Sequence, residues 1–281
     1  MFKIFYYLLI AFFLISCESD SYDLVIQNGI IYDGSGSESE SADIGIIGNQ
    51  IVKVGKINSK NSLKIIDASG LVVSPGFIDT HAHLDPMSNF IKLSNGESHV
   101  RQGVTTSFGG PDGRGVPLKY GFKEYLDSIE KVGVGMNVGF LTGHNKIRRV
   151  VMNLDNREPT EEELERMKNL ASKAMDEGAF GISTGLKYLP GNFSKVDEVI
   201  EISKEISKKG GVYTSHLRDE GLKIIEAVNE AIKISKDADI SVVLTHHKVI
   251  GKPMWGKSSI TLSLIDSARQ KGIKVMADQY P

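Results

Sequence analysis

Two histidines at the end of an apolar run constrain this chain more than any other feature. His81 and His83 follow a run that begins at Leu71. Side chains alternate along a β-strand, so residues two positions apart point to the same side. Neutral imidazole is a preferred ligand of zinc and similar ions. We interpret the pair as half of a metal site. The alternative is a surface pair without a ligand.

Two later apolar runs also end in histidines, and they decide between these interpretations. Residues 211–216 end in His216, and the run that starts at Ile240 leads to His246 and His247. The chain has seven histidines, and five of them stand at the ends of strand-like segments. A single histidine in such a place is usually a core or rim residue. Five at equivalent positions of a repeating pattern favour one shared metal centre.

Strand-like runs alternate with helical stretches along most of the chain. We expect barrel strands to begin near Val72, Val104, Val134, Phe180, Val212, Ser241 and Lys274. Alternating strands and helices are typical of parallel β/α architecture. In a β/α barrel the functional groups stand at the C-terminal ends of the strands, where these histidines fall. The sequence therefore predicts a TIM-type (β/α)8 barrel.

The helices of this pattern have recognisable ends. Thr160 and Glu163 form the signature of a capping box, which predicts a helix that runs towards Gly178. Three further helices are expected over residues 194–210, 222–235 and 259–272. The first of these begins at Ser194 and stops at a pair of glycines, as helices commonly do.

We divide the chain into a small N-terminal β-sheet domain, residues 22–70, and a barrel, residues 71–281. Asn28–Gly29 and Gly48–Asn49 are expected tight turns of the small sheet, which is marginal alone and needs a neighbour. The barrel region offers seven strands and is shorter than the roughly 250 residues of a complete barrel. Pro281 follows the last strand directly. We therefore expect an incomplete barrel, truncated before strand eight.

Residues 1–17 have the features of a bacterial lipoprotein signal peptide. A basic start precedes an apolar core that is too short for a transmembrane span, and residues 14–17 resemble the lipoprotein box, in which the cysteine is lipidated. Cys17 is the only cysteine, which excludes intramolecular disulfides. An ordinary cleaved signal peptide is the alternative. We expect an extracytoplasmic protein, periplasmic or at the cell surface, with a lipid anchor in a bacterial membrane.

The net charge of −2 gives no reason to expect a nucleic acid partner.

Several segments of the chain resemble the amidohydrolase superfamily and, within it, the N-acyl-D-amino-acid deacylase (D-aminoacylase) family. The matching segments are residues 23–29, 75–83, 102–106, 143–144, 181–188, 215–221, 246–248 and 278–281. The histidine pair alone indicates only the superfamily. Ser215–Gly221 and His246–Lys248 together are specific to the deacylase branch.

The resemblance implies a barrel of the metal-dependent hydrolase kind with a zinc centre. His216 and His246 match the ligands of one tightly held zinc, and His81 and His83 match those of a second, weaker position. The best-known members of the family have a cysteine ligand where this chain has a stretch containing Asp112. A carboxylate can also ligate or bridge zinc, so Asp112 is the expected substitute. A plain turn residue is the alternative reading of Asp112, and the number of metals stays open.

The resemblance also implies a place for the substrate's carboxylate. The matching positions are Tyr188, Lys248 and Tyr280. An ammonium group and two phenols suit an anion because all three donate hydrogen bonds. Arg218 either assists the substrate or pairs with a nearby acid. His144 is a weaker site candidate with a structural alternative, and His247 is expected to be only a neighbour of the site.

The implied activity is zinc-dependent hydrolysis of N-acyl-D-amino acids, which releases a carboxylate and a D-amino acid. In the family the general base is an aspartate at the end of strand eight, which would lie beyond Pro281. Neither Asp79 nor Asp278 is a convincing replacement. We therefore expect the 281-residue chain alone to be inactive or nearly so.

Other functions stay open. A dihydroorotase-like or hydantoinase-like cyclic amidase, or a dipeptidase, would share the fold and the metal site. Those enzymes commonly use a carboxylated lysine on the fourth strand, whereas Lys187 lies just past that strand. A non-catalytic fragment, a lipoprotein that only binds a ligand, and a transport or structural lipoprotein are further alternatives, and metal content would discriminate among them.

Overall fold

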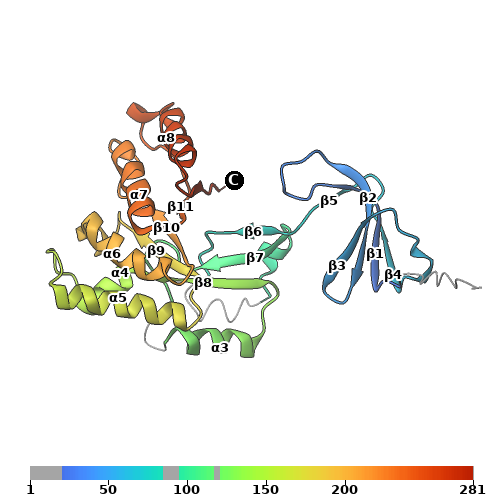
Figure 1. The fold of residues 1–281 in the computed structure, drawn as a ribbon, viewed down its shortest axis with the longest axis horizontal. Helices are drawn as coiled ribbons and strands as arrows, with labels where there is room; N and C mark the ends of the chain where they lie inside the picture. Colours follow the sequence, from blue (N-terminus) through green and yellow to red (C-terminus); the bar gives the residue numbers. More distant parts are fainter. Residues whose placement is uncertain (1–20, 85–94, 117–120, 281) are drawn as a thin grey trace, which may run out of the picture. The chain divides into compact units, whose positions relative to one another are not determined.

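The structure is a computed structural model that describes residues 21–84, 95–116 and 121–280. The chain forms two compact units, Met1–Pro75 and Gly76–Pro281 (Figure 1). The expected signal peptide and its Cys17 lie outside the described residues. Within the described part, no helix combines the length and the apolar character that crossing a bilayer requires.

The first unit is a five-stranded sheet organised around its first strand. Its strands are β1 (Leu24–Ile31), β2 (Glu40–Ile47), β3 (Gln50–Gly55), β4 (Lys64–Asp67) and β5 (Val72–Val73), with the 3-10 helix η1 (Ser59–Asn61) before β4. Strand β1 pairs antiparallel with β2 and parallel with β4 and β5. Tyr22, Val25 and Ile57 form its small buried core.

One of the two expected turns is confirmed and the other is wrong. Gly48 and Asn49 connect β2 to β3 as a two-residue turn, and Gly48 has the positive φ of +58° that such turns need. Asn28 and Gly29 instead lie inside β1, where Asn28 at φ +61° forms a bulge. The amide of Asn28 donates to Asp43 Oδ1 at 3.0 Å. Bulges and turns both use left-handed asparagine, so the dipeptide alone did not distinguish them.

The boundary between the units differs from the expected one. Val72 and Val73 pair with Ile30 and Ile31 of β1, so the prediction that the first barrel strand begins at Val72 is wrong. The first strand of the second unit begins at Phe77. Residues 74–76 break the apolar run because Pro75 has no amide hydrogen to donate to a sheet. The units therefore meet at Pro75–Gly76 rather than after residue 70.

The second unit is an incomplete TIM-type barrel, as the sequence predicts. Its strands are β6 (Phe77–Asp79), β7 (Val104–Gly109), β8 (Asn137–Gly143), β9 (Gly181–Gly185), β10 (Val212–His216), β11 (Val242–Leu244) and β12 (Val275–Ala277). All neighbouring strands are parallel and follow the chain order from β6 to β12. All seven C-terminal strand ends therefore lie at one edge of the sheet.

Helices cover the outer side of this sheet (Figure 1). They are α2 (Glu97–Val100), α3 (Phe122–Val132), α4 (His144–Met152), α5 (Glu161–Asp176), α6 (Val196–Ser207), α7 (Ile224–Ala238) and α8 (Ser258–Gln270), with 3-10 helices η3 (Gly191–Phe193) and η4 (Lys252–Met254). The capping box of Thr160 and Glu163 is confirmed at the start of α5. Ser194 does not cap α6, because its hydroxyl donates to the Gly191 carbonyl at 2.6 Å.

The main core lies between these helices and the strands. Helix α6 shows how it forms, because Val199, Ile202 and Ile206 recur at helical spacing and are 1% exposed or less. They pack in one cluster with Tyr213 of β10 and Val242 of β11. Burial of each such side chain contributes about 1.5–3 kcal/mol. This layer fixes the two strands whose ends carry the later histidines.

Candidate metal centre

The structure brings four histidines and one aspartate from different strand ends together. His81 and His83 follow β6, Asp112 lies in the loop after β7, His216 is the last residue of β10, and His246 follows β11. They are separated by up to 165 positions in the sequence (246 − 81), but the parallel sheet places all of them at its C-terminal edge. The predicted ligand set therefore occupies one place.

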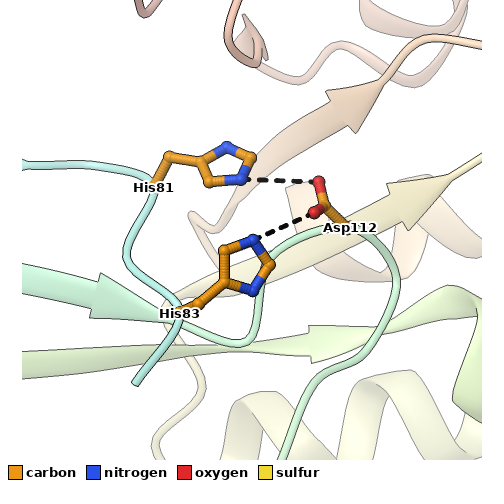
Figure 2. Close-up of side chains that lie close together, drawn as sticks. All are labelled: His81, His83 and Asp112. Atoms are coloured by element: carbon orange, nitrogen blue, oxygen red, sulfur yellow. Dashed lines mark ion pairs between the residues drawn. The ribbon is translucent and has the colours of Figure 1, made fainter. Parts of the chain in front are cut away.

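Asp112 is at the centre of the cluster. Its Oδ2 lies 3.2 Å from His83 Nε2, and its Oδ1 lies 3.5 Å from His81 Nε2 (Figure 2). The same Oδ1 is 3.4 Å from His216 Nδ1 and 3.8 Å from His246 Nε2. Asp112 is thus a shared member of two possible metal-binding triads, one with His81 and His83 and the other with His216 and His246.

The spacing of these atoms fits metal ions. Two ligand atoms bound at about 2.1 Å to one tetrahedral zinc lie about 3.4 Å apart, close to the distances between the Asp112 oxygens and the imidazoles. The buried atoms Asp112 Oδ1 and His81 Nδ1 have no hydrogen-bond partner among the described residues. Imidazole nitrogen and carboxylate oxygen are both accepted zinc ligands. The residues present fit one zinc, or two that share Asp112.

Asp112 contributes a negative charge to the cluster. Asp112 is only 7% exposed. Burial acts to raise its pKa, but the facing imidazoles of His216, His81 and His83 outweigh burial and hold the pKa far below the usual range of an aspartate. Asp112 is therefore ionised at neutral pH. A carboxylate that stays charged in a buried place is suited to a cation.

Glycines allow the loop of Asp112 to approach the sheet. A Cβ on Gly113 would stand 2.0 Å from Asn145 Oδ1, and a Cβ on Gly185 would stand 2.3 Å from the Asp112 carbonyl oxygen. Both positions therefore exclude a side chain. The Gly113 amide donates to Ser183 Oγ of β9 at 3.0 Å, which fastens the loop to that strand. Sequence alone showed Gly113 only as part of a turn-like stretch and Gly185 only within the matching segment 181–188.

Two acidic residues that sequence reasoning did not assign support the histidines. Glu220 Oε1 lies 3.0 Å from His246 Nδ1 and 2.5 Å from Lys248 Nζ. Burial acts to raise the pKa of Glu220, but hydrogen bonds from His246 and Lys248 lower it to about 2. Asp278 Oδ1 accepts a hydrogen bond from the His246 amide at 2.5 Å, and its Oδ2 accepts one from Thr80. The sequence signal that could have found Glu220 was its place within the segment 215–221, which resembles the deacylase family.

The contact with Glu220 determines which nitrogen of the His246 ring carries the hydrogen when the other faces the cluster. When Nε2 faces the cluster as a neutral ligand, the hydrogen is on Nδ1, and Nδ1 donates it to Glu220. The ammonium of Lys248 lies 3.0 Å from the same Nδ1, but it binds Glu220 and the His246 carbonyl in this state. Glu220 therefore connects a metal-ligand candidate to a substrate-binding candidate.

The three residues expected to hold the substrate carboxylate stand near the cluster. The Tyr188 ring centroid is 4.6 Å from that of His216, and the Tyr280 centroid is 6.5 Å from that of His246. Lys248 Nζ lies 5.6 Å from the Tyr280 centroid. Both tyrosines are exposed, so their hydroxyls are accessible to a small molecule.

The other predicted residues have different surroundings. Arg218 binds both carboxylate oxygens of Glu230 and two backbone carbonyls, which favours the alternative that it pairs with an acid. His144 is fully buried and contacts Glu198, which also binds Arg148, so its contacts favour a structural role. His247 contacts the Thr261 hydroxyl rather than the cluster. These three residues therefore do not belong to the cluster of four histidines and Asp112.

Comparisons with known proteins show what this chain is similar to. A family model described as the amidohydrolase family matches residues 64–275. The chain is 35% identical to a D-aminoacylase of Alcaligenes xylosoxydans xylosoxydans, over 94% of this chain and 58% of that protein. The chain spans less than two thirds of that relative.

Two solved structures are similar along nearly the whole chain. One is N-acyl-D-glutamate deacylase from Bordetella bronchiseptica in complex with zinc and a phosphonate inhibitor, with 31% identity, a TM-score of 0.86, and coverage of 93% of this chain and 59% of that one. The other belongs to a study of the binuclear metal centre in D-aminoacylase, with 34% identity, a TM-score of 0.85, and coverage of 92% and 58%.

Proposed function

The chain belongs to the amidohydrolase family, and from this premise we propose that its histidine–aspartate cluster serves zinc-dependent hydrolysis of N-acyl-D-amino acids. The observation that carries the proposal is the meeting of four imidazoles and a buried carboxylate at the C-terminal edge of a parallel sheet. The substrate class is supported by relatives named D-aminoacylase and N-acyl-D-glutamate deacylase.

Each part of the cluster has an assigned task. His216 and His246 would hold the tighter zinc and His81 and His83 the weaker one, with Asp112 within reach of both pairs. Bound zinc supplies Lewis acidity towards an amide carbonyl and lowers the pKa of a water molecule. Glu220 keeps the His246 ring oriented, because it accepts the Nδ1 hydrogen.

Lys248, Tyr188 and Tyr280 bind the substrate's α-carboxylate. An ammonium group and phenolic hydroxyls all donate hydrogen bonds to an anion, and charge-assisted bonds of this kind are strong. Lys248 shares its ammonium between Glu220 and the substrate, since an ammonium has three donors. This places the amide bond beside the cluster, in one orientation that depends on the configuration of the α-carbon.

The reaction consumes one water molecule per amide. The amide C–N bond breaks, a C–O bond forms to the water oxygen, and the nitrogen gains a proton from water as it leaves as an amine. Asp79 and Asp278 are held by backbone and hydroxyl donors near the histidines, so we assign the proton transfer to neither. We propose that an aspartate after an eighth strand performs it.

The cyclic-amidase alternative receives less support. Strand β9 is the fourth strand of the barrel and contains no lysine. Lys187 is exposed two residues beyond its end. Asp112 instead occupies the position between the two histidine pairs, where a carboxylated lysine would be required. A ligand-binding protein without catalysis would have no need for both histidine pairs.

The test uses zinc-loaded protein on paired N-acetyl-D- and N-acetyl-L-amino acids. Free amine is measured with and without a chelator. We expect release from the D series only, and we expect the chelator to abolish it. Because the chain spans little more than half of its relatives, the assay is run on residues 1–281, which we expect to be inactive or nearly so, and on a form extended to include an eighth strand. Zinc-bound extended protein that releases no amine would refute the proposal, and turnover by residues 1–281 at the level of the extended protein would refute the assignment of the general base to an eighth strand.

We also propose that Cys17 carries a lipid that anchors the protein to the outer side of a bacterial membrane. The support is the basic start, the apolar core and the lipoprotein-box sequence before Cys17. In a bacterial host, Cys17→Ser should shift the protein from the membrane fraction to the soluble fraction. Retention of the variant in the membrane fraction would contradict the anchor.

A further inference from the structure

The side chain of Asn145 is buried beside the metal centre and has no task in the functions assigned above. Asn145 is the second residue of α4 and is 7% exposed. Its Nδ2 donates to the Gly185 carbonyl at 2.8 Å and to the Tyr188 carbonyl at 3.2 Å. Its Oδ1 accepts a hydrogen bond from the Gly185 amide at 3.0 Å. Both hydrogens and the oxygen of the carboxamide are therefore paired with backbone groups.

The Asn145 carboxamide takes the place of a strand residue. Strand β8 pairs with β9 as far as Gly143 and Ser183. Helix α4 then begins at His144, whereas β9 continues to Gly185. Gly185 would pair with Asn145 if β8 continued in the same register, and the Asn145 side chain instead supplies the donor and the acceptor. Gly185 is buried, so its backbone groups need these partners.

This contact fixes the turn that carries Tyr188. The Tyr188 amide donates to the Gly185 carbonyl at 2.9 Å, and Asn145 connects both ends of this turn to α4. The Asn192 amide also donates to the Tyr188 carbonyl, but Asn192 belongs to the same loop and adds no connection to α4. The Tyr188 ring lies beside His216. The place of the Tyr188 hydroxyl relative to the cluster therefore depends on this turn.

Two glycines leave the space that the Asn145 carboxamide occupies. A Cβ on Gly191 would stand 2.5 Å from Asn145 Nδ2, and the three atoms nearest to it all belong to the carboxamide. A Cβ on Gly113 would stand 2.0 Å from Asn145 Oδ1. The Lys146 amide donates to the Gly113 carbonyl at 3.2 Å, which holds the start of α4 against the loop of Asp112. A carboxamide enclosed in this way keeps one position, which suits a residue that positions others.

We propose that Asn145 is a positioning residue for Tyr188 and acts on substrate binding through the place of the Tyr188 hydroxyl. In this role Asn145 itself binds neither zinc nor substrate, but holds residues 185–188 in place. A phenol donates a single hydrogen bond, so its contribution to binding a carboxylate depends on where its oxygen lies. The inference rests on the proposed function for the role of Tyr188 in binding the α-carboxylate.

Hydrogen exchange tests the positioning independently of any substrate. Asn145→Ala removes the carboxamide. Asn137→Ala is the matched control, because Asn137 Nδ2 donates to the Thr105 carbonyl at the opposite end of β8. In Asn145→Ala we expect the amides of residues 185–188 to exchange about tenfold faster, as the loss of one hydrogen bond gives. The amides of residues 212–216 should exchange as in wild type, and the control should change neither segment.

Gly191→Ala is a second variant that keeps Asn145 itself. The added methyl group displaces the carboxamide, so faster exchange of residues 185–188 is expected here as well. Thermal unfolding of each variant shows whether it folds, and Gly191→Ala carries the test alone if Asn145→Ala does not fold.

Ligand binding to the zinc-loaded chain tests the consequence for the site. N-acetyl-D-alanine is titrated by calorimetry beside N-acetyl-D-alaninamide, which has no carboxylate. We expect Asn145→Ala to weaken binding of the acid about tenfold and binding of the amide less than about threefold. Zinc retention should stay the same. A merely structural role would not separate the two ligands.

A double-mutant cycle shows whether Asn145 acts through Tyr188. Tyr188→Phe removes the hydroxyl and should itself weaken binding of the acid about tenfold. Residues that act through one hydrogen bond do not have additive effects. Adding Asn145→Ala to Tyr188→Phe should therefore weaken binding by less than about a further twofold.

Four results would overturn the positioning role. They are unchanged exchange of residues 185–188 in the folded variants, equal weakening of both ligands, loss of zinc from folded Asn145→Ala, and additive effects in the cycle. If Tyr188→Phe weakens binding of the acid and Asn145→Ala does not, the proposed function stands and this inference alone is refuted. If Tyr188→Phe binds the acid as tightly as wild type, the proposed role of Tyr188 is wrong and the inference falls with it.

Discussion

Replacing Glu220 by glutamine tests the support that this residue gives to His246. Glutamine keeps the shape and the accepting oxygen of the side chain but removes its charge. Glu220 is 11% exposed and lies 3.0 Å from His246 Nδ1, and its pKa of about 2 means that it is ionised at pH 7. The substitution therefore exchanges a charged acceptor for a neutral one in a mostly buried place.

The expected size follows from that exchange. A hydrogen bond to a charged group contributes about 1.5–3 kcal/mol and one to a neutral group about 0.5–1.5 kcal/mol, so the loss is about 1–1.5 kcal/mol. This corresponds to about tenfold weaker zinc binding, at the lower end of the 10–100-fold range for partners of ligand histidines. The same ring orientation is needed whether one zinc or two are bound.

Competition with a chromophoric zinc chelator measures the affinity of the tightest site. Glu226→Gln is the control, because Glu226 is exposed in the first turn of α7 and forms no ion pair with a described residue. We expect Glu220→Gln to bind zinc about tenfold more weakly than both wild type and this control. Folded Glu220→Gln that binds zinc within twofold of wild type would refute the positioning role of Glu220.

Further predictions concern the centre, its loop and the buried charges. Asp112→Asn should weaken retention of zinc more than about 100-fold, since a ligand matters more than its partners, and elemental analysis after dialysis checks this. Gly113→Ala should lower the free energy of unfolding in urea by about 1–3 kcal/mol, and more than Gly256→Ala, whose Cβ would meet open space. Burial acts to raise the pKa of Glu198, but hydrogen bonding to His144 and the nearby charges lower it below its usual 4.5. The stabilising contribution of ionised Glu198 is therefore complete above pH 4.5 and is lost as the pH falls further. Glu198→Gln should therefore lose less stability between pH 6 and pH 3 than wild type. The midpoints of urea unfolding measure this difference.

The clustering of the candidate ligands could be predicted because a parallel barrel puts all strand ends at one edge of the sheet. His81, His216 and His246 needed only the alternation of strands and helices to be brought together. Asp112 was found through the resemblance, since its position matched a ligand of another kind. The boundary at Pro75 was harder, because the apolar run from Leu71 reads as a single strand until pairing partners are known.

Contacts made by loop side chains could not be predicted in the same way. Glu220 and Arg218 lie two residues apart in one segment, yet Glu220 contacts His246 of the cluster and Arg218 binds Glu230. The direction of each side chain depends on how the loop after β10 folds, and no periodic pattern determines that. Asn28 illustrates the same limit, because only the pairing of β1 with β2 shows that it forms a bulge.

Zinc retention is the most direct test of the proposed metal centre. Purified protein is loaded with zinc, dialysed against metal-free buffer and measured by elemental analysis, beside the folded variant His216→Ala. We expect wild type to retain at least one zinc per chain and the variant to lose it. Wild type that retains no zinc, or a variant that retains as much as wild type, would contradict the assignment of His81, His83, Asp112, His216 and His246 as a metal centre.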